Sequence, residues 1–366
     1  MNSLIIGSNG FIGKNLKLKL EEENINYYEV TKKTKLKKLE NYCKKADIIF
    51  HVAGQNLSKL KWDFKKNNVL ITYKICEILN KFNRKPKLIY LSTIKINEKT
   101  NYGNTKKEAE KILKKFSVKN KSQVSILRLP NVYGKWCNPN YNSFISTMLY
   151  NIPRSIKFKK INFQNKIKLI HVDDVVSKMI GLIYKNPNKL ISIVKPDKIL
   201  TIRKLYESIN KMWFCHKNGY LYEYKSVFDR KLYSTFLTYI PKKNYHRYIK
   251  KYEDKRGMFS ELLKNKKSGQ INVFSINPGE TRGKHYHNIK NEKFIILSGS
   301  VVFNMKCLNT KEKISKKMSA NNISEIVSVP GWIHEIKNIG KKVAIILLWS
   351  NEIFDKKNPD TYLKAL

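Results

Sequence analysis

The stretch that decides the fold is Leu4-Ile5-Ile6-Gly7-Ser8-Asn9-Gly10-Phe11-Ile12-Gly13, near the start of a 366-residue chain. A short apolar run ends in glycines, and helix-like sequence follows over Asn9–Leu20. The first glycine permits a tight turn, the second lets the backbone approach a pyrophosphate, and the third allows close packing of helix on strand. The helix N-terminus then faces the anion. The stretch predicts a dinucleotide-binding loop, with a merely tight turn as the alternative.

Strand-like and helix-like segments alternate through the first two thirds of the chain. The expected strands are Leu4–Ile6, Tyr27–Val30, Asp47–Val52, Lys87–Leu91 and Val124–Leu129, with helices over Val69–Phe82 and Thr105–Phe116. Strands that alternate with helices at this spacing predict a Rossmann-type, doubly wound and mostly parallel sheet.

The last third of the chain has a different pattern. From about Asn244 it contains short β-rich runs separated by Gly, Pro and Asn turns, namely Ile271–Ile276, Phe294–Leu297, Val301–Met305, Ile326–Val329 and Val343–Trp349. Such runs predict an all-β sandwich or barrel. A chain of this length is expected to form two domains, so we predict domains at residues 1–242 and 243–366.

Composition excludes several classes of protein. The chain carries 73 Lys and Arg against 28 Asp and Glu, a net charge of +45, but only eight of the basic residues are Arg. Arg is favoured for base and phosphate contacts, and the charge is spread along the chain, so no nucleic-acid partner is expected.

The chain contains no run of eighteen apolar residues, so no membrane insertion is expected. The five cysteines are scattered without a CxxC pair, which fits a reducing cytoplasm. The first residues are interpreted as a strand, not a signal peptide.

Three residues form a candidate catalytic set. Tyr102 and Lys106 lie at i and i+4, which puts both on one face of a helix. A neighbouring ammonium favours the ionised phenol, so the pair can exchange a proton with a carbonyl while hydride moves. Thr93, at the end of the fourth strand, can polarise the same oxygen.

The end of the second strand bears on the choice of cofactor. An NAD enzyme usually offers a carboxylate there, whereas an NADP enzyme offers a cation to the 2′-phosphate. Glu29 is expected within the strand and Lys32 near its tip, so the sequence favours NADPH.

Residues 1–240 resemble the extended short-chain dehydrogenase/reductases that act on nucleotide sugars. The matching motifs are His51-Val52-Ala53-Gly54, Asn68, Arg128-Leu129-Pro130-Asn131-Val132-Tyr133-Gly134 and His171-Val172-Asp173-Asp174-Val175. The resemblance assigns catalysis to Thr93, Tyr102 and Lys106. It implies cofactor contacts from Gly7, Asn9, Gly10, Phe11, Ile12, Gly13, Lys32, Ala53, Gly54, Asn68, Tyr102, Lys106 and Pro130. Thr93 and Tyr102 are closer in sequence than in most relatives, so we expect a differently built substrate cleft.

The all-β region contains a candidate metal site. His285 and His287 alternate along a strand, Glu292 follows on the next segment, and His334 comes from a distant strand. Three imidazoles and a carboxylate suit Zn²⁺ or a similar divalent ion. The alternative is that these histidines lie in the core with their hydrogen bonds satisfied and bind no metal. The pattern resembles the two motifs of the cupins.

The segments Asp254-Lys255-Arg256-Gly257 and Arg282-Gly283-Lys284-His285 resemble the nucleotide-sugar 3,5-epimerases, which are also cupins. That resemblance implies substrate contacts from Arg256 and Arg282, with surface ion pairs as the alternative. It assigns the base to His285, which is also a candidate metal ligand, so the proton-transfer residue stays open.

The order of the two regions resembles the CapF family of bifunctional capsular polysaccharide synthesis enzymes. Further matching segments are residues 134–143, 232–237 and 358–362. This resemblance implies C3 epimerisation of a UDP-2-acetamido-2,6-dideoxy-4-hexulose in the cupin, then C4 reduction with NADPH to the L-talose product of the UDP-N-acetyl-L-fucosamine pathway. It also implies a homodimer and substrate contacts from Asn131, Asn140, Asn142, Arg256 and Arg282.

Two other interpretations stay open. The first is a nucleotide-sugar 4-epimerase or dehydratase that recycles tightly bound NAD without net redox. The second is a metal-stabilised binding or scaffold protein whose reductase half is vestigial. The metal could either act in catalysis or brace the barrel.

Overall fold

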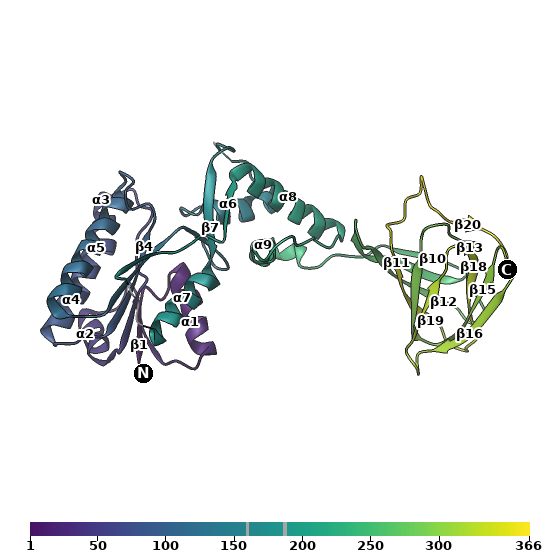
Figure 1. Cartoon of the computed structure of the whole chain (residues 1–366), viewed down its shortest axis with the longest axis horizontal. Coiled ribbons are helices and arrows are strands. Elements are labelled where there is room, and N and C mark those ends of the chain that lie inside the picture. The colour runs from purple at the N-terminus through teal and green to yellow at the C-terminus, as the bar shows by residue number, and fades with distance from the viewer. Residues whose placement is uncertain (159–160, 186–188) are drawn as a thin grey trace. The chain divides into compact units, whose positions relative to one another are not determined.

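The protein contains two compact units in the computed structural model, which describes residues 1–158, 161–185 and 189–366 (Figure 1). The N-terminal unit comprises Met1–Asn210 and Tyr224–Pro241, and the C-terminal unit comprises Lys211–Glu223 and Lys242–Leu366. The domain boundary at residues 242–243 stays a prediction. In the described part of the chain, no helix is both long enough and apolar enough to cross a membrane.

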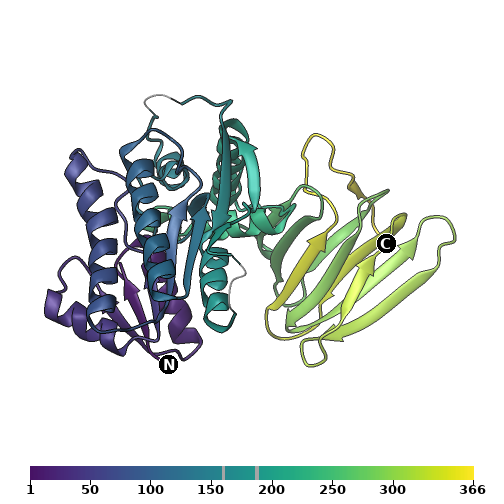
Figure 2. The same cartoon turned by 60° about the vertical axis from the view of Figure 1, so that its left-hand side comes forward.

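The N-terminal unit is built on a parallel sheet with strand order β2-β1-β3-β4-β5-β8 (Figure 2). The strands are β1 (Ser3–Ile6), β2 (Tyr27–Val30), β3 (Ile48–His51), β4 (Lys87–Thr93), β5 (Val124–Leu129) and β8 (Ile191–Ile193). All five strands predicted for this region are present. The strand order reverses between β1 and β3, and ligands of such sheets bind at the carboxyl ends of the strands at that point.

Helices cover both faces of this sheet (Figure 1). One face carries α1 (Phe11–Glu22) and α7 (Val172–Tyr184), and the other carries α2 (Leu36–Lys45), α4 (Ile71–Lys81) and α5 (Asn101–Asn120). Successive strand residues point to opposite faces. Leu4 and Ile6 therefore pack with the α2, α4 and α5 layer, whereas Ile5 packs with α1 and α7. Both faces are buried, which explains why the strands read as continuous apolar runs.

The helical region before α4 differs from the prediction. A helix was expected over Val69–Phe82, but the helical chain begins at α3 (Lys61–Phe64) and passes through a π-helical segment at Lys65–Leu70. The segment buries Asn68 and Val69. Insertions of this kind are frequent at functional sites.

A small second sheet follows the main one in the N-terminal unit. It has the order β6-β7-β9, in which β6 (Asn131–Tyr133) pairs parallel with β7 (Lys166–His171) and β7 pairs antiparallel with β9 (Lys198–Thr201). The remaining helices are α6 (Phe144–Asn151), α8 (Ile202–Asn218) and α9 (Val227–Leu237). Because β6 begins two residues after β5 ends, Pro130 and Asn131 lie at the carboxyl edge of the main sheet.

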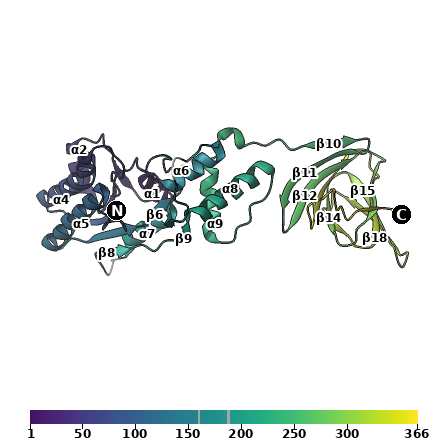
Figure 3. The same ribbon diagram turned by 90° about the horizontal axis from the view of Figure 1, so that it is seen from above.

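The C-terminal unit consists of two antiparallel sheets (Figure 3). The first has the order β10-β11-β12-β19-β14-β17, with strands β10 (Lys251–Asp254), β11 (Gly257–Asn265), β12 (Gly269–Ile276), β19 (Ala344–Ser350), β14 (Glu292–Ser298) and β17 (Glu325–Ser328). The second has the order β16-β15-β18-β13-β20, with strands β16 (Lys313–Ser319), β15 (Ser300–Cys307), β18 (Trp332–Asn338), β13 (Thr281–Tyr286) and β20 (Tyr362–Leu363).

An apolar core joins the two sheets of the C-terminal unit. Phe274 and Phe294 from the first sheet pack with Phe303 and Ile336 from the second. Each of the five β-rich runs predicted from the sequence lies on a strand. The predicted fold class, a Rossmann-type parallel sheet followed by an all-β domain, is confirmed.

Candidate active site

The glycine loop after β1 is shaped for a closely approaching ligand. Gly7 has φ +99°, and a Cβ added there would lie 2.7 Å from the backbone of Ala53. A Cβ on Gly13 would lie 2.2 Å from the carbonyl oxygen of Gly7, so α1 packs directly on the loop. No side chain caps the N-terminus of α1, and its first turn contains no acidic residue. Its N–H groups and the positive end of the helix dipole can therefore receive an anion.

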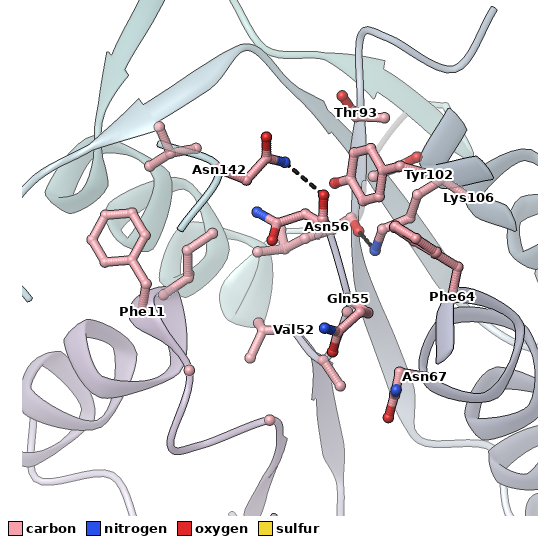
Figure 4. Close-up of a pocket in the computed structure, with 18 of the residues that line it drawn as sticks. Phe11, Val52, Gln55, Asn56, Phe64, Asn67, Thr93, Tyr102, Lys106 and Asn142 are labelled. Atoms are coloured by element: carbon pink, nitrogen blue, oxygen red, sulfur yellow. Dashed lines mark hydrogen bonds between the residues drawn. The ribbon is translucent and has the colours of Figure 1, made fainter. Parts of the chain in front are cut away.

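A pocket of about 1630 Å³ opens at this edge of the N-terminal sheet (Figure 4). Most of the predicted cofactor, catalytic and substrate residues of this unit line it, namely Gly7, Asn9, Gly10, Phe11, Ile12, Lys32, Ala53, Gly54, Thr93, Tyr102, Lys106, Pro130, Asn131 and Asn142. Gly13, Asn68 and Asn140 do not. The structure therefore brings together residues that are far apart in the sequence, and most of the predicted set shares one cavity.

The end of β2 presents cations and hydroxyls to the pocket. Thr31, Lys32 and Lys33 line it, and the Lys32 ammonium donates to Gln55 Oε1 at 3.1 Å. Glu29 lies inside β2 and pairs with Lys17 Nζ at 2.7 Å. The only acidic residues among the described lining residues are Asp63 and Glu98, and neither follows β2. This arrangement suits the 2′-phosphate of NADP better than the free hydroxyl of NAD.

The predicted catalytic residues converge at the carboxyl end of β4. Thr93 is the last residue of β4, and α5, capped by Thr100, carries Tyr102 and Lys106 (Figure 4). The Lys106 ammonium donates to the carbonyl oxygen of Leu91 at 2.9 Å and lies 4.6 Å from the centre of the Tyr90 ring. A Cβ on Gly54 would lie 3.0 Å from Lys106 Nζ, so a larger residue there would press on the amine.

Burial controls the protonation of this pair. It raises the pKa of Tyr102 to about 12. It also lowers the pKa of Lys106 to about 7, although the Glu110 carboxylate opposes that change. The expectation that an ammonium would favour the ionised phenol is therefore not met in the protein alone. Desolvation disfavours both charged forms, and Tyr102 keeps its proton at neutral pH.

An ion pair supports the floor of the pocket beneath these residues. Glu110 on α5 is buried and accepts two hydrogen bonds from Arg128 on β5, at 2.7 and 3.0 Å. The hydroxyl of Ser92 donates to the same carboxylate at 2.6 Å. This network ties α5 to β4 and β5 directly below the strand end that carries Thr93.

Asn68 supports the pocket without lining it. Its side-chain oxygen accepts from the backbone N–H of Gln55 at 2.7 Å, and its amide donates to the Gln55 carbonyl and the Thr105 hydroxyl. The π-helical segment places this buried side chain behind the loop after β3. Asn68 fixes the backbone next to Ala53 and Gly54, and its contact with the cofactor stays a prediction.

The loop after β6 reaches across the pocket (Figure 4). Asn142 donates to the carbonyl oxygen of Asn56 at 2.6 Å, and the Tyr141 hydroxyl lies 2.8 Å from Gln55 Nε2. Asn140 has a left-handed backbone, and its N–H is bound by Thr147. Sequence reasoning missed Gln55, Asn56 and Tyr141. The first two follow directly after the His51–Gly54 motif, which was a usable signal.

The predicted metal ligands form one cluster in the C-terminal unit. His285, His287, Glu292 and His334 each offer one ligand atom, and these atoms lie within 4.8 Å of one another. Glu292 Oε2 lies 3.3 Å from His287 Nε2 and 3.4 Å from His334 Nε2, and both nitrogens are buried without a hydrogen bond. Buried polar atoms normally have a partner, so these orphaned nitrogens fit a bound cation.

The protonation states also fit a metal. Burial lowers the pKa of His285 to about 4, which leaves a neutral imidazole. Burial alone would raise the pKa of Glu292, but the neighbouring His287, His334 and Lys290 hold it well below its usual value. Neutral imidazoles and an ionised carboxylate are the forms that bind metal ions.

The two arginines predicted to contact substrate share an acidic partner. Arg256 makes two hydrogen bonds to Asp254 Oδ2, at 2.5 and 3.1 Å. Arg282 donates to the Gly257 carbonyl at 2.8 Å and lies 3.3 Å from Asp254 Oδ1. Their substrate role stays a prediction, because the ion-pair alternative describes their geometry equally well.

Fold and pocket together define a Rossmann-type dinucleotide-binding protein that continues into an antiparallel β-domain. Residues 3–193 match the NAD dependent epimerase/dehydratase family, and residues 252–362 match the polysaccharide biosynthesis C-terminal domain. The chain belongs to this family, as a CapF-like member with both domains.

Individual relatives agree with this assignment. The chain is 34% identical over 364 residues to the UDP-2-acetamido-2,6-beta-L-arabino-hexul-4-ose reductase of Pseudomonas aeruginosa, covering 99% of this chain and 98% of that one. The crystal structure of the capsular polysaccharide assembling protein CapF from Staphylococcus aureus superposes with a TM-score of 0.91 at 32% identity, covering all of both chains. UDP-glucose 4-epimerase of Thermotoga maritima, at 19% identity and a TM-score of 0.55, covers 65% of this chain and 98% of its own, and shares the fold.

Proposed function

We propose that the protein is a bifunctional nucleotide-sugar enzyme of capsular polysaccharide biosynthesis. The C-terminal unit epimerises C3 of a UDP-2-acetamido-2,6-dideoxy-4-hexulose. The N-terminal unit then reduces the C4 ketone with NADPH to UDP-2-acetamido-2,6-dideoxy-L-talose. The observation that carries the proposal is the convergence of Thr93, Tyr102 and Lys106 on one pocket with the glycine loop. The full-length relative named as a reductase of a UDP-linked acetamido hexulose supports the substrate class.

The reduction needs one hydride and one proton. When bound, NADPH supplies the hydride to C4. The glycine loop and the N-terminus of α1 would hold its pyrophosphate, and Lys32 would supply the positive charge for its 2′-phosphate. Tyr102, protonated at neutral pH, donates its proton to the C4 oxygen as negative charge develops there. Thr93 hydrogen-bonds the same oxygen, and Lys106 orients the phenol and the ribose.

The epimerisation must come first. A C4 ketone acidifies the C3 proton because the resulting carbanion delocalises into an enolate. A base in the C-terminal unit removes that proton, and a proton that has exchanged with solvent is added to C3 on the opposite face. Once C4 is an alcohol, C3 is no longer acidic and its configuration is locked. A divalent ion held by His285, His287, Glu292 and His334, for which Zn²⁺ is our choice, would supply Lewis acidity or brace the barrel.

The test combines the purified protein, NADPH and the UDP-linked 4-keto sugar in deuterated water. We expect stoichiometric loss of reduced nicotinamide and deuterium at C3. In Tyr102→Phe, NADPH consumption should fall by about 100-fold or more, since general acid catalysis typically contributes that much, while C3 exchange continues. Tyr184→Phe, an exposed tyrosine outside the pocket, is the matched control.

Two outcomes contradict the proposal. If the wild-type protein leaves NADPH unconsumed with the 4-keto sugar but interconverts the C4 epimers of a UDP-linked sugar that carries a C4 hydroxyl, it is the non-redox 4-epimerase instead. If Tyr102→Phe also abolishes C3 exchange, the division of the two reactions between two sites is wrong.

A further inference from the structure

The C-terminal strap, which we define as residues 359–363, is attached to the edge of the metal cluster. Its strand β20 pairs with β13, where Leu363 lies opposite His285 and Tyr362 lies opposite Tyr286. The rings of Tyr286 and Tyr362 stack with centroids 5.2 Å apart. The strap thus lies along the strand that carries one candidate ligand, more than 70 residues earlier in the chain.

Asp360 in the strap binds the loop between two other candidate ligands. Its carboxylate accepts the backbone N–H of Asn288 at 3.0 Å, and those of Ile289 and Lys290 at 2.8 Å each. These three residues connect His287 to the segment that carries Glu292. A carboxylate that accepts three backbone N–H donors is a strong anchor.

The backbone of Asp360 also fixes one imidazole. His287 Nδ1 donates to the Asp360 carbonyl oxygen at 2.5 Å, which leaves Nε2 as the ring nitrogen directed at the other candidate ligands. That nitrogen faces Glu292 Oε2 at 3.3 Å. Asp360 has φ +38°, a left-handed conformation that aspartate adopts more readily than most residues. Here the three bonds of its side chain hold the carbonyl oxygen on His287.

The same anchor extends to Glu292. Lys290, whose N–H is bound by Asp360, places its buried ammonium 3.3 Å from Glu292 Oε1. One carboxylate oxygen is thereby occupied by Lys290, and Oε2 is directed to the imidazoles. Both His287 and Glu292 thus depend on the loop that Asp360 ties down.

We propose that Asp360 is a positioning residue that sets the ligand geometry and affinity of the metal site; this rests on the metal proposed above. Groups that orient metal ligands in this way typically change metal affinity by about 10–100-fold when removed. Asp360→Ala in the full-length protein should weaken Zn²⁺ binding by about tenfold or more. The Zn²⁺ affinity of Asp360→Asn should lie between those of Asp360→Ala and the wild type, because its side-chain oxygen still accepts hydrogen bonds from some of the N–H groups of the loop. Asp355→Ala is the matched control, since it removes an equal charge from an exposed residue whose carboxylate accepts a hydrogen bond from the backbone of Lys357, and not from the loop between His287 and Glu292.

The measurement is competition for Zn²⁺ between apo protein and a chromophoric chelator, alongside the visible spectrum of the Co²⁺-substituted protein. A changed Co²⁺ spectrum reports ligand geometry, which general destabilisation of the fold does not alter. If Asp360→Ala does not fold, the Zn²⁺ affinity and the Co²⁺ spectrum of Asp360→Asn test the proposal in its place.

Equal Zn²⁺ affinity and equal Co²⁺ spectra in the folded variants and the wild type would overturn the inference. So would an equal loss of affinity in Asp355→Ala. A wild-type protein that takes up neither metal would instead overturn the metal site itself, and the role of Asp360 with it.

Discussion

Lys106 should couple the stability of the N-terminal unit to pH. The amine is 4% exposed, and burial lowers its pKa to about 7 in the folded protein without dinucleotide. A lysine in an unfolded chain has a pKa of about 10.4. Between these two values the unfolded chain binds about one more proton than the folded chain. The free energy of unfolding must therefore rise with pH across this window, by up to about 1.4 kcal/mol per pH unit.

The perturbation is Lys106→Met, which removes the amine and keeps a side chain of similar shape. From pH 8 to pH 9, we expect the free energy of unfolding of the wild type to rise by about 1 kcal/mol relative to that of this variant. Exposed lysines titrate alike in both proteins and cancel in the difference. Between pH 5 and pH 6, Lys106 is protonated in both the folded and the unfolded chain. The difference in the free energy of unfolding between the wild type and Lys106→Met should therefore be constant there.

The assay is urea unfolding of the protein without cofactor. The transition that belongs to the N-terminal unit is identified in a separate sample as the one that added NADPH shifts to higher urea concentration. A difference that stays constant between pH 8 and pH 9 would refute the reasoning. It would mean that the Leu91 carbonyl and the face of Tyr90 keep the buried amine charged despite its desolvation.

Three further results are expected. Gly13→Ala should abolish NADPH binding in a fluorescence titration, because the new Cβ would lie 2.2 Å from a carbonyl oxygen of the glycine loop, whereas Gly181→Ala, with no atom within 4 Å, should bind normally. Lys32→Ala should weaken NADPH binding by about tenfold and leave NADH binding unchanged if Lys32 contacts the 2′-phosphate; equal losses would contradict that contact. Arg128→Met should lower the free energy of unfolding by about 3–5 kcal/mol in urea, because it leaves the Glu110 carboxylate buried without its partner. A loss below about 1 kcal/mol would mean that Glu110 takes up a proton or is reached by water.

The sequence predicted most of what depends on local pattern. Apolar runs that alternate with helical segments located the strands of the parallel sheet, because strands buried on both faces are apolar at consecutive positions. Tyr102 and Lys106 were paired from helical spacing alone. His285, His287, Glu292 and His334 were grouped because histidines are rare in this chain and cluster by position.

Features that depend on contacts distant in sequence were missed. Asp360 binds a loop some 70 residues earlier, through backbone N–H groups that carry no sequence signature. The π-helical segment around Asn68 arises from the contacts that this side chain makes with Gln55 and Thr105, and not from local propensity. The raised pKa of Tyr102 follows from the burial of its hydroxyl by residues distant in sequence, whereas spacing shows only that a lysine is near.

The position of the strap has a consequence for how the protein is made. Chains leave the ribosome N-terminus first and fold domain by domain, so the dinucleotide pocket can close around its ligand while the last strand is still being translated. Asp360 is synthesised after all four candidate ligands. An ion bound before residue 360 emerges would therefore be held without the Asp360 anchor, and the full ligand geometry would form only after the strap pairs with β13.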